Sequence, residues 1–187
     1  GVEPSNRIAG GLHPYFRRYG LVEGTPVLVW SGDNPNSLVG VGAGTPGTAV
    51  ISLGTSDVFF AAMPGMKTDP AGFGHVFGNP AGGFMSLIAF KNGSLARENV
   101  RDACGVDWEF FGSRAFEESN PGNHGNLMLP YYIPEITPLV LQPGIQFQGS
   151  EEFCAGRASS AVKVRAVVES QALSLRLHSR WIGTHFE

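Results

Sequence analysis

The sequence is poor in cysteine, in long apolar runs and in clustered positive charge. Its 187 residues include only Cys104 and Cys154, and two cysteines at that separation make no disulfide framework. We therefore expect reduced thiols and a cytoplasmic protein. No stretch reaches the roughly 18 to 20 apolar residues of a membrane span, so we expect no membrane partner.

The charge balance excludes further classes of protein. The sequence has 13 Lys and Arg against 16 Asp and Glu, a net charge of −3. No basic tract exceeds two residues, so a general nucleic-acid surface is not expected. His75, His124 and His178 show no metal-ligand spacing, and the sequence therefore assigns no metal ligand. A Gly-x-Ser-x-Gly elbow is also missing, which disfavours a serine hydrolase.

Glycine and proline are present in excess. The chain has 26 glycines and 13 prolines, but its 42% hydrophobic and 11% aromatic residues are enough for a core. This composition predicts one folded domain with many loops.

The first half of the chain predicts short strands and one short helix. The apolar run 26–31 lies between glycines and predicts a buried strand. Asn34 and Pro35 predict a helix start, with Asn34 as N-cap, and the helix turns Leu38 and Val41 inward.

Strands are also predicted at 48–53 and 57–61. Because only three residues separate them, they predict an antiparallel hairpin. The later elements are a strand at 74–77, a helix over 84–103 interrupted by Asn92-Gly93, a helix over 107–118, a strand at 127–133, loop up to 156, and a helix over 159–182. The last helix has charged residues beside its apolar stripe that are expected to face solvent: Lys163, Arg165, Arg176 and Arg180. Together these elements predict an α/β domain with a mixed sheet and flanking helices.

Asp33 is the first candidate for chemistry, because it stands where a strand ends and a helix begins. Ligands of α/β proteins bind at such strand ends, and a carboxylate there can accept a proton from a substrate hydroxyl. The alternative is that Asp33 and Asn34 only start the helix.

Gly54-Thr55-Ser56 is the second candidate. Glycine lets a ligand approach the backbone, and the adjacent hydroxyls and N–H groups can hold phosphate oxygens. A plain hairpin turn would explain the same residues. The pattern is not a Walker A loop, because no Gly-Lys-Ser/Thr follows.

Two further features have open interpretations. Trp108 can stack a purine ring, although most tryptophans only pack in or near a core. Asn92-Gly93 is either a kink in its helix or a point where a ligand meets the backbone.

The order and separation of these motifs resemble the C-terminal domain of the FGGY carbohydrate kinases. Gly32-Asp33-Asn34-Pro35 precedes Ser52-Leu53-Gly54-Thr55-Ser56 by about twenty residues, as in that family. Further similar segments lie at 74–80, 90–95, 135–138 and 164–169. The resemblance implies an actin-like, ribonuclease-H-like fold. It also implies phosphoryl transfer from ATP, with Mg²⁺, to a sugar hydroxyl, and D-xylulose is the expected sugar.

The resemblance also implies roles for individual residues. Asp33 matches the catalytic base, and with Asn34 it belongs to the sugar site. Gly54, Thr55 and Ser56 match the turn that holds the ATP phosphates. Two more positions are implied to bind the nucleotide, namely Gly93 and Trp108.

The resemblance implies an incomplete enzyme. Residues 1–187 correspond to a second domain cut before the family's adenosine motif, and the N-terminal sugar-binding domain is missing, so we expect this piece to be inactive by itself. Other sugars or polyols, such as ribulose, gluconate or glycerol, remain alternatives. A catalytically silent nucleotide-binding module and a homodimer also stay open.

Overall fold

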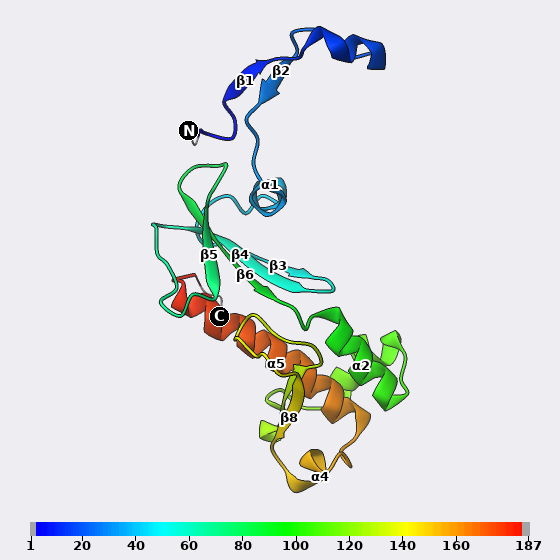
Figure 1. The fold of residues 1–187 in the computed structure, drawn as a ribbon. Helices are drawn as coiled ribbons and strands as arrows, with labels where there is room; N and C mark the ends of the chain where they lie inside the picture. Colours follow the sequence, from blue (N-terminus) through cyan, green and yellow to red (C-terminus); the bar gives the residue numbers. More distant parts are fainter. Residues whose placement is uncertain (1–2, 185–187) are drawn as a thin grey trace.

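The computed structural model describes residues 3–184, which form an elongated molecule with an N-terminal arm, a central sheet and a helical end (Figure 1). The central sheet has four strands in the order β3-β4-β6-β5, and every pairing in it is antiparallel. The sheet and the two helices beside it are β3 (Ala49–Leu53), β4 (Asp57–Met63), β5 (Gly74–Gly78), β6 (Phe84–Phe90), α1 (Asp33–Gly40) and α5 (Ser160–Trp181).

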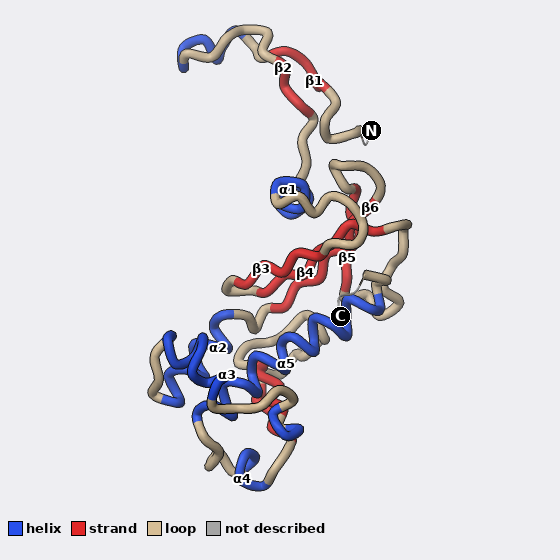
Figure 2. Tube along the Cα trace, turned by 180° about the vertical axis from the view of Figure 1, so that it is seen from behind, coloured by secondary structure: helices blue, strands red, loops and turns tan. Residues whose placement is uncertain are grey.

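The two central strands, β4 and β6, are buried because both faces of the sheet are covered. Alternate residues of a strand point to opposite faces. Phe59 therefore packs in one apolar cluster with Leu175 of α5, whereas Phe60 packs in another with Leu38 of α1. Figures 1 and 2 show α1 and α5 on opposite sides of the sheet. The prediction of an α/β fold with flanking helices is confirmed.

The predicted hairpin is also confirmed, with pairing from Ala49–Ala61 to Leu53–Asp57. The residues Gly54-Thr55-Ser56, named here the Gly54 turn, join β3 to β4. The predicted strand at 74–77 is confirmed as β5.

The single helix predicted over 84–103 is wrong. Residues Phe84–Phe90 are strand β6, and the helix is α2 (Ser94–Cys104). Because β6 is covered on both faces, its residues are apolar except Ser86 and show no strand alternation. Asn92-Gly93 is therefore not a break inside a helix, but the bend between a strand and a helix. We name it the Asn92-Gly93 bend.

The helical end has its own apolar core, in which Val164 and Val167 of α5 pack with Phe111 and Met128. Its other elements are a π-helical turn (Phe110–Arg114), α3 (Ala115–Glu117), a 3-10 turn (Asn123–Gly125), β7 (Leu127–Tyr131), β8 (Gly144–Gln148) and α4 (Glu151–Cys154). The predictions of a helix over 107–118 and a strand at 127–133 are confirmed. The loop expected up to 156 contains β8 and α4, which sequence patterning missed because β8 is exposed throughout and α4 has a single turn.

The arm contradicts the prediction of a buried strand at 26–31. Strand β2 (Pro26–Leu28) pairs with β1 (Ile8–Gly11), and both strands are exposed. A 3-10 helix, η1 (Pro14–Tyr19), lies between them in the sequence. The apolar run is real, but no second layer of the described chain covers it.

The start of α1 also differs from the prediction. The helix begins at Asp33 with Gly32 as its N-cap, and no side chain caps it, so Asn34 is not the N-cap. Leu38 is fully buried as predicted, whereas Val41 follows the helix and is 64% exposed.

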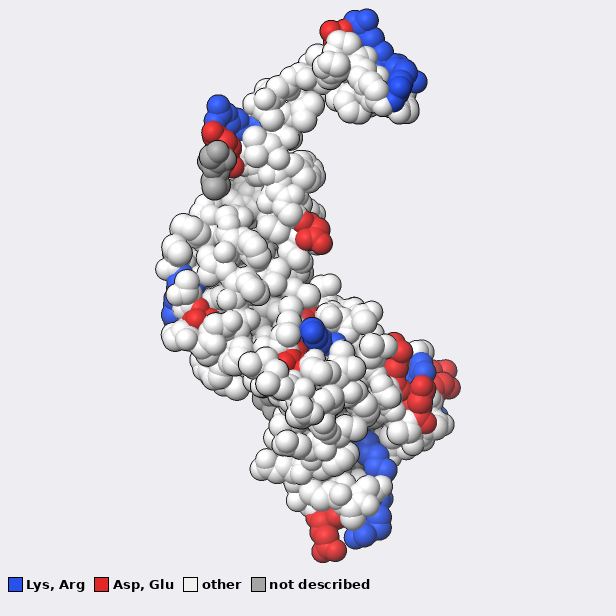
Figure 3. All heavy atoms as spheres, in the orientation of Figure 1, with Lys and Arg blue, Asp and Glu red and all other residues white. Residues whose placement is uncertain are grey.

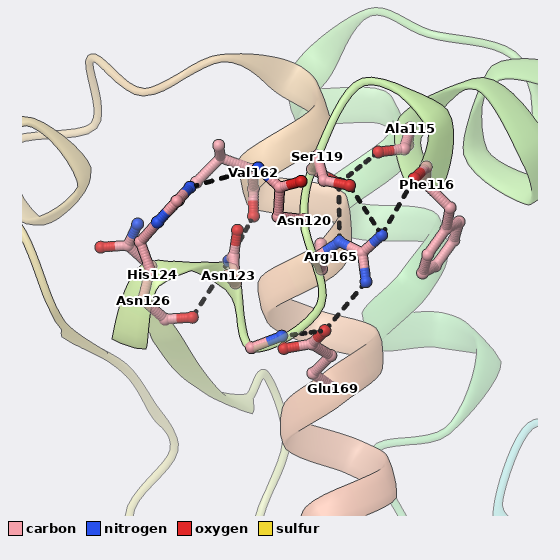
Figure 4. Close-up of polar contacts among 11 residues, drawn as sticks. Ala115, Phe116, Ser119, Asn120, Asn123, His124, Asn126, Val162, Arg165 and Glu169 are labelled. Carbon is pink, nitrogen blue, oxygen red and sulfur yellow. Dashed lines mark hydrogen bonds and ion pairs between the residues drawn. The ribbon is translucent and has the colours of Figure 1, made fainter.

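Arg165 was expected to face solvent and is instead 6% exposed. Figure 4 shows its guanidinium beside Phe116 and Ser119, which lie much earlier in the chain. It donates to Ser119 Oγ at 2.7 Å and to the carbonyl oxygens of Phe116 and Ser119 at 3.0 Å each, and it pairs with Glu169 at 2.9 Å. These acceptors replace the water that the guanidinium loses on burial. The place of Arg165 beside an apolar helical stripe gives no sign of them, so the sequence pattern could not predict the burial.

The surface carries little concentrated charge. On the face drawn in Figure 3, charged side chains lie in small separate groups and uncharged atoms cover most of the middle. Within residues 3–184, no helix has the length and apolarity needed to cross a membrane. Cys104 and Cys154 are both free thiols, as predicted.

Candidate functional site

Asp33 and Asn34 line an open cleft of about 450 Å³ between the arm and the sheet. Asp33 is exposed, and its Oδ1 accepts hydrogen bonds from Asn34 N at 2.8 Å and from Asn34 Nδ2 at 3.3 Å. The remaining lining residues are Glu3, Pro4, Ser5, Trp30, Ser31, Gly32, Pro35, Phe77, Gly78, Asn79 and Pro80. The Asp33 carboxylate is thus at the first turn of α1, held by its neighbour and accessible to a ligand.

The structure brings the Gly54 turn and the Asn92-Gly93 bend into direct contact. Gly93 N donates to Thr55 O at 3.2 Å, and Ser94 N donates to Gly54 O at 2.7 Å. A Cβ on Gly93 would lie 2.7 Å from Gly54 O and 2.8 Å from Asp57 N. No real Cβ makes contacts that short with backbone, so the close approach requires glycine at position 93.

The Thr55 and Ser56 side chains of the turn are exposed beside this contact. Hydroxyls and backbone N–H groups on a fixed turn suit an oxyanion ligand. Of the predicted site residues, therefore, Gly54, Thr55, Ser56 and Gly93 are assembled in one place. None of them lines the cleft that contains Asp33.

Glu135 also holds the bend in place. It is 3% exposed, and its carboxylate accepts hydrogen bonds from Lys91 N at 2.7 Å and from both Asn92 N and Asn92 Nδ2 at 2.9 Å. It also accepts from Ile136 N at 2.8 Å. Such a set of donors is what a buried carboxylate needs in place of water. Burial raises the pKa of nearby Tyr131, and the Glu135 charge raises it further.

A buried ion pair joins the turn to helix α2. Arg97 Nη1 lies 2.6 Å from Asp57 Oδ2, and Nη2 lies 2.9 Å from Oδ1, a bidentate arrangement. The Asp57 and Arg97 side chains are 3% and 14% exposed. Arg97 Nη1 also donates to Gln171 Oε1 of α5 at 2.9 Å. Gln171 Nε2 in turn donates to Asn92 O at 2.7 Å and to Gly93 O at 3.2 Å.

Sequence patterning missed Asp57, Arg97 and Gln171. Asp57 did carry a signal, because it is a carboxylate that opens an otherwise apolar strand. Arg97 and Gln171 carried none, since both are ordinary residues on the polar side of a helical pattern.

Trp108 follows the end of α2, whose 11 residues begin directly after Gly93. The indole is 48% exposed and meets Phe111 edge-on, and the Arg101 guanidinium lies 4.5 Å from its ring centroid. No contact joins Trp108 to the Gly54 turn within the described residues, so the structure does not bring it together with Gly54, Thr55, Ser56 and Gly93.

The described residues contain no cluster of side chains suited to binding a metal ion. No group of three or more His, Cys, Asp or Glu there could hold one. Magnesium in kinase sites is bound mainly through substrate phosphates, with one or two carboxylates and water. No residue of the described chain is therefore assigned as a magnesium ligand.

The chain is similar to curated xylulose kinases, although no family model matches it. The chain is 37% identical over 184 residues to the xylulose kinase of Rattus norvegicus, covering 96% of this chain and 33% of the rat protein. It is 36% identical to xylulose kinase 2 of Arabidopsis thaliana, covering 97% of this chain and 35% of that protein.

The solved structures agree. The crystal structure of xylulose kinase from Bifidobacterium adolescentis superposes with a TM-score of 0.75 at 28% sequence identity, covering 89% of this chain and 33% of that one. The fold is that of an FGGY kinase domain, which is ribonuclease-H-like. The chain belongs to the FGGY family of carbohydrate kinases, as its motifs indicated. Within that family its curated relatives are xylulose kinases, of whose length it spans about a third.

Proposed function

We propose that the chain is the C-terminal, nucleotide-binding domain of an ATP-dependent kinase that phosphorylates D-xylulose on its 5-hydroxyl. The observation that carries the proposal is the contact between the Gly54 turn and Gly93, which presents backbone and hydroxyls at one fixed place. The similarity to xylulose kinases over nearly the whole chain supports the sugar.

In this proposal the two halves of the site have separate tasks. Asp33 accepts the proton of the attacking sugar hydroxyl, and Asn34 contacts the sugar. Gly54, Thr55, Ser56 and Gly93 hold the ATP phosphates. Trp108 lies beside the adenosine.

Phosphoryl transfer needs alignment and charge neutralisation more than covalent chemistry. Mg²⁺ bound with ATP supplies part of that neutralisation. Asp33 is suited to its task because its carboxylate is accessible and its geometry is set by Asn34. We place this enzyme in the cytoplasm, and a homodimer stays a prediction.

The test is an assay of the complete polypeptide with ATP, Mg²⁺ and a panel of sugars. We expect D-xylulose to give the highest kcat/KM. Preference for ribulose, gluconate or glycerol would replace the sugar and keep the class of enzyme. Nucleotide binding measured by calorimetry, without turnover on any sugar, would instead indicate a silent module.

Asp33→Asn tests the base. The change keeps the side chain's shape and one oxygen, so the fold is preserved, while turnover falls by about 10²- to 10⁴-fold. Glu151→Gln is the control, because Glu151 also opens a helix and is exposed but lies outside the cleft. Turnover of Asp33→Asn within about tenfold of wild type removes Asp33 as the base.

A further inference from the structure

The ion pair between Arg97 and Asp57 occupies a specific place in the molecule. Asp57 is the first residue after the Gly54 turn, and Arg97 is in the first turn of α2, directly after the Asn92-Gly93 bend. The pair therefore joins the Gly54 turn to the Asn92-Gly93 bend through side chains. The hydrogen bonds from Gly93 N and Ser94 N join the same two segments through the backbone.

Gln171 connects this junction to the long helix α5. Its side-chain oxygen accepts from Arg97, and its amide donates to the carbonyl oxygens of Asn92 and Gly93. Arg97, Asp57 and Gln171 are linked in one chain of hydrogen bonds, and a buried network of this kind holds its members in one arrangement. Three separate elements, β4, α2 and α5, are thus tied together at the turn.

Asp57 is not available to bind a ligand, because both of its oxygens accept from the guanidinium and its side chain is 3% exposed. Arg97 directs Nη1 and Nη2 to Asp57 and Gln171. These contacts favour a structural task for Arg97, although an arginine beside a phosphate-binding turn would ordinarily suggest direct binding.

We propose that Arg97 is a positioning residue for nucleotide binding: it braces Asp57 and Gln171 so that the Gly54 turn stays closed against Gly93. This inference rests on the proposed function, since it assumes that the turn holds phosphates. A ligand binds more tightly when the donors of its site are already in position, because less free energy is spent on ordering them. Small displacements of such donors therefore weaken binding. Loss of the Arg97 side chain should therefore weaken ATP binding and leave sugar binding unchanged.

The experiment measures KM for ATP and for D-xylulose separately in the complete polypeptide. Arg97→Met should raise KM for ATP by roughly 10- to 100-fold, because the turn is no longer held in place. KM for the sugar should stay within about twofold of wild type. Hydrogen exchange of the unliganded protein should show faster exchange at the Gly93 and Ser94 amides.

A second variant separates positioning from mere stability. Arg97→Met leaves Asp57 buried and unpaired, which by itself can destabilise the fold. The double variant Asp57→Asn/Arg97→Met removes both charges, so the fold should recover while KM for ATP stays high. Arg97→Lys should restore part of the ATP affinity, since lysine keeps the charge but not the bidentate geometry.

The matched control is Arg165→Met/Glu169→Gln. This pair is largely buried, at 8% and 21% side-chain exposure, and it also ties α5 to a loop, but to residues 116–122 and not to the Gly54 turn (Figure 4). It should leave both KM values unchanged. A rise of both KM values alike in Arg97→Met, or a double variant with wild-type KM for ATP, overturns the positioning role. Wild-type protein without turnover on any sugar overturns the proposed function instead.

Discussion

The two halves of the candidate site differ in how tightly the protein holds them. Asp33 lies in an open cleft, and among residues 3–184 its hydrogen bonds reach only its neighbour Asn34. The Gly54 turn is held by backbone hydrogen bonds, by the ion pair at Asp57 and, through the bend, by Glu135. The Gly54 turn is therefore fixed by contacts from several elements of this chain, whereas the Asp33 carboxylate is held by its neighbour.

This difference follows from the chemistry that each half is proposed to perform. Donors fixed in advance around the phosphates stabilise the charge that develops during transfer, so a rigid turn suits the task proposed for it. Asp33 is proposed to accept a proton from a sugar that reaches it through an open cleft, and this task requires an accessible carboxylate. Substitutions in the two halves should accordingly have very different effects on stability.

The largest effect on stability is expected for Glu135→Ala. It leaves the amides of Lys91 and Asn92 without an acceptor, and each buried donor left unpaired costs about 1–3 kcal/mol. We expect the free energy of unfolding to fall by about 2–6 kcal/mol, measured by urea denaturation. Glu151→Ala, an exposed glutamate, is the control. A loss no larger than in that control would show that Glu135 does not hold the bend.

A smaller but still clear loss is expected for Gly93→Ala. The added Cβ would lie within 2.8 Å of Gly54 O and Asp57 N, so the turn must move away from the bend. Overpacking of this kind costs about 1–3 kcal/mol. Gly112→Ala provides the comparison, because a Cβ there meets no atom within 4 Å. Equal stability of the two variants would mean that the turn and the bend are not in contact in solution.

The smallest effect is expected for Asp33→Ala. The side chain is exposed and its hydrogen bonds reach only Asn34, so the free energy of unfolding should change by less than about 0.5 kcal/mol. Thermal denaturation of the variant beside wild type measures it. A loss comparable with that of Gly93→Ala would make Asp33 a structural residue and remove the contrast between the two halves.

The sequence predicted the hairpin and its turn because a short connection between apolar runs leaves one simple geometry. It did not predict β6, since a strand covered on both faces has no alternation to distinguish it from a buried helix. The same limit explains Arg165, whose burial depends on acceptors from residues 116–119 that no local pattern relates to it.

The candidate site could be predicted in its motifs but not in its supports. Asp33, Gly54 and Gly93 stand in recognisable segments, and the structure brings Gly54 and Gly93 into contact. Gln171 is 78 residues from Gly93 in the sequence, and nothing in its neighbours indicates that it reaches the bend. Contacts between residues so far apart in the sequence depend on how α5 packs against the sheet, which no local pattern specifies.

Trp30 gives this molecule an optical reporter in the right place. Its indole is 63% exposed and lines the same cleft as Asp33. The chain has only two other tryptophans, Trp108 and Trp181. A variant with phenylalanine at those two positions would emit from Trp30 alone. Its fluorescence would then follow the filling and covering of the cleft in real time, without any added label.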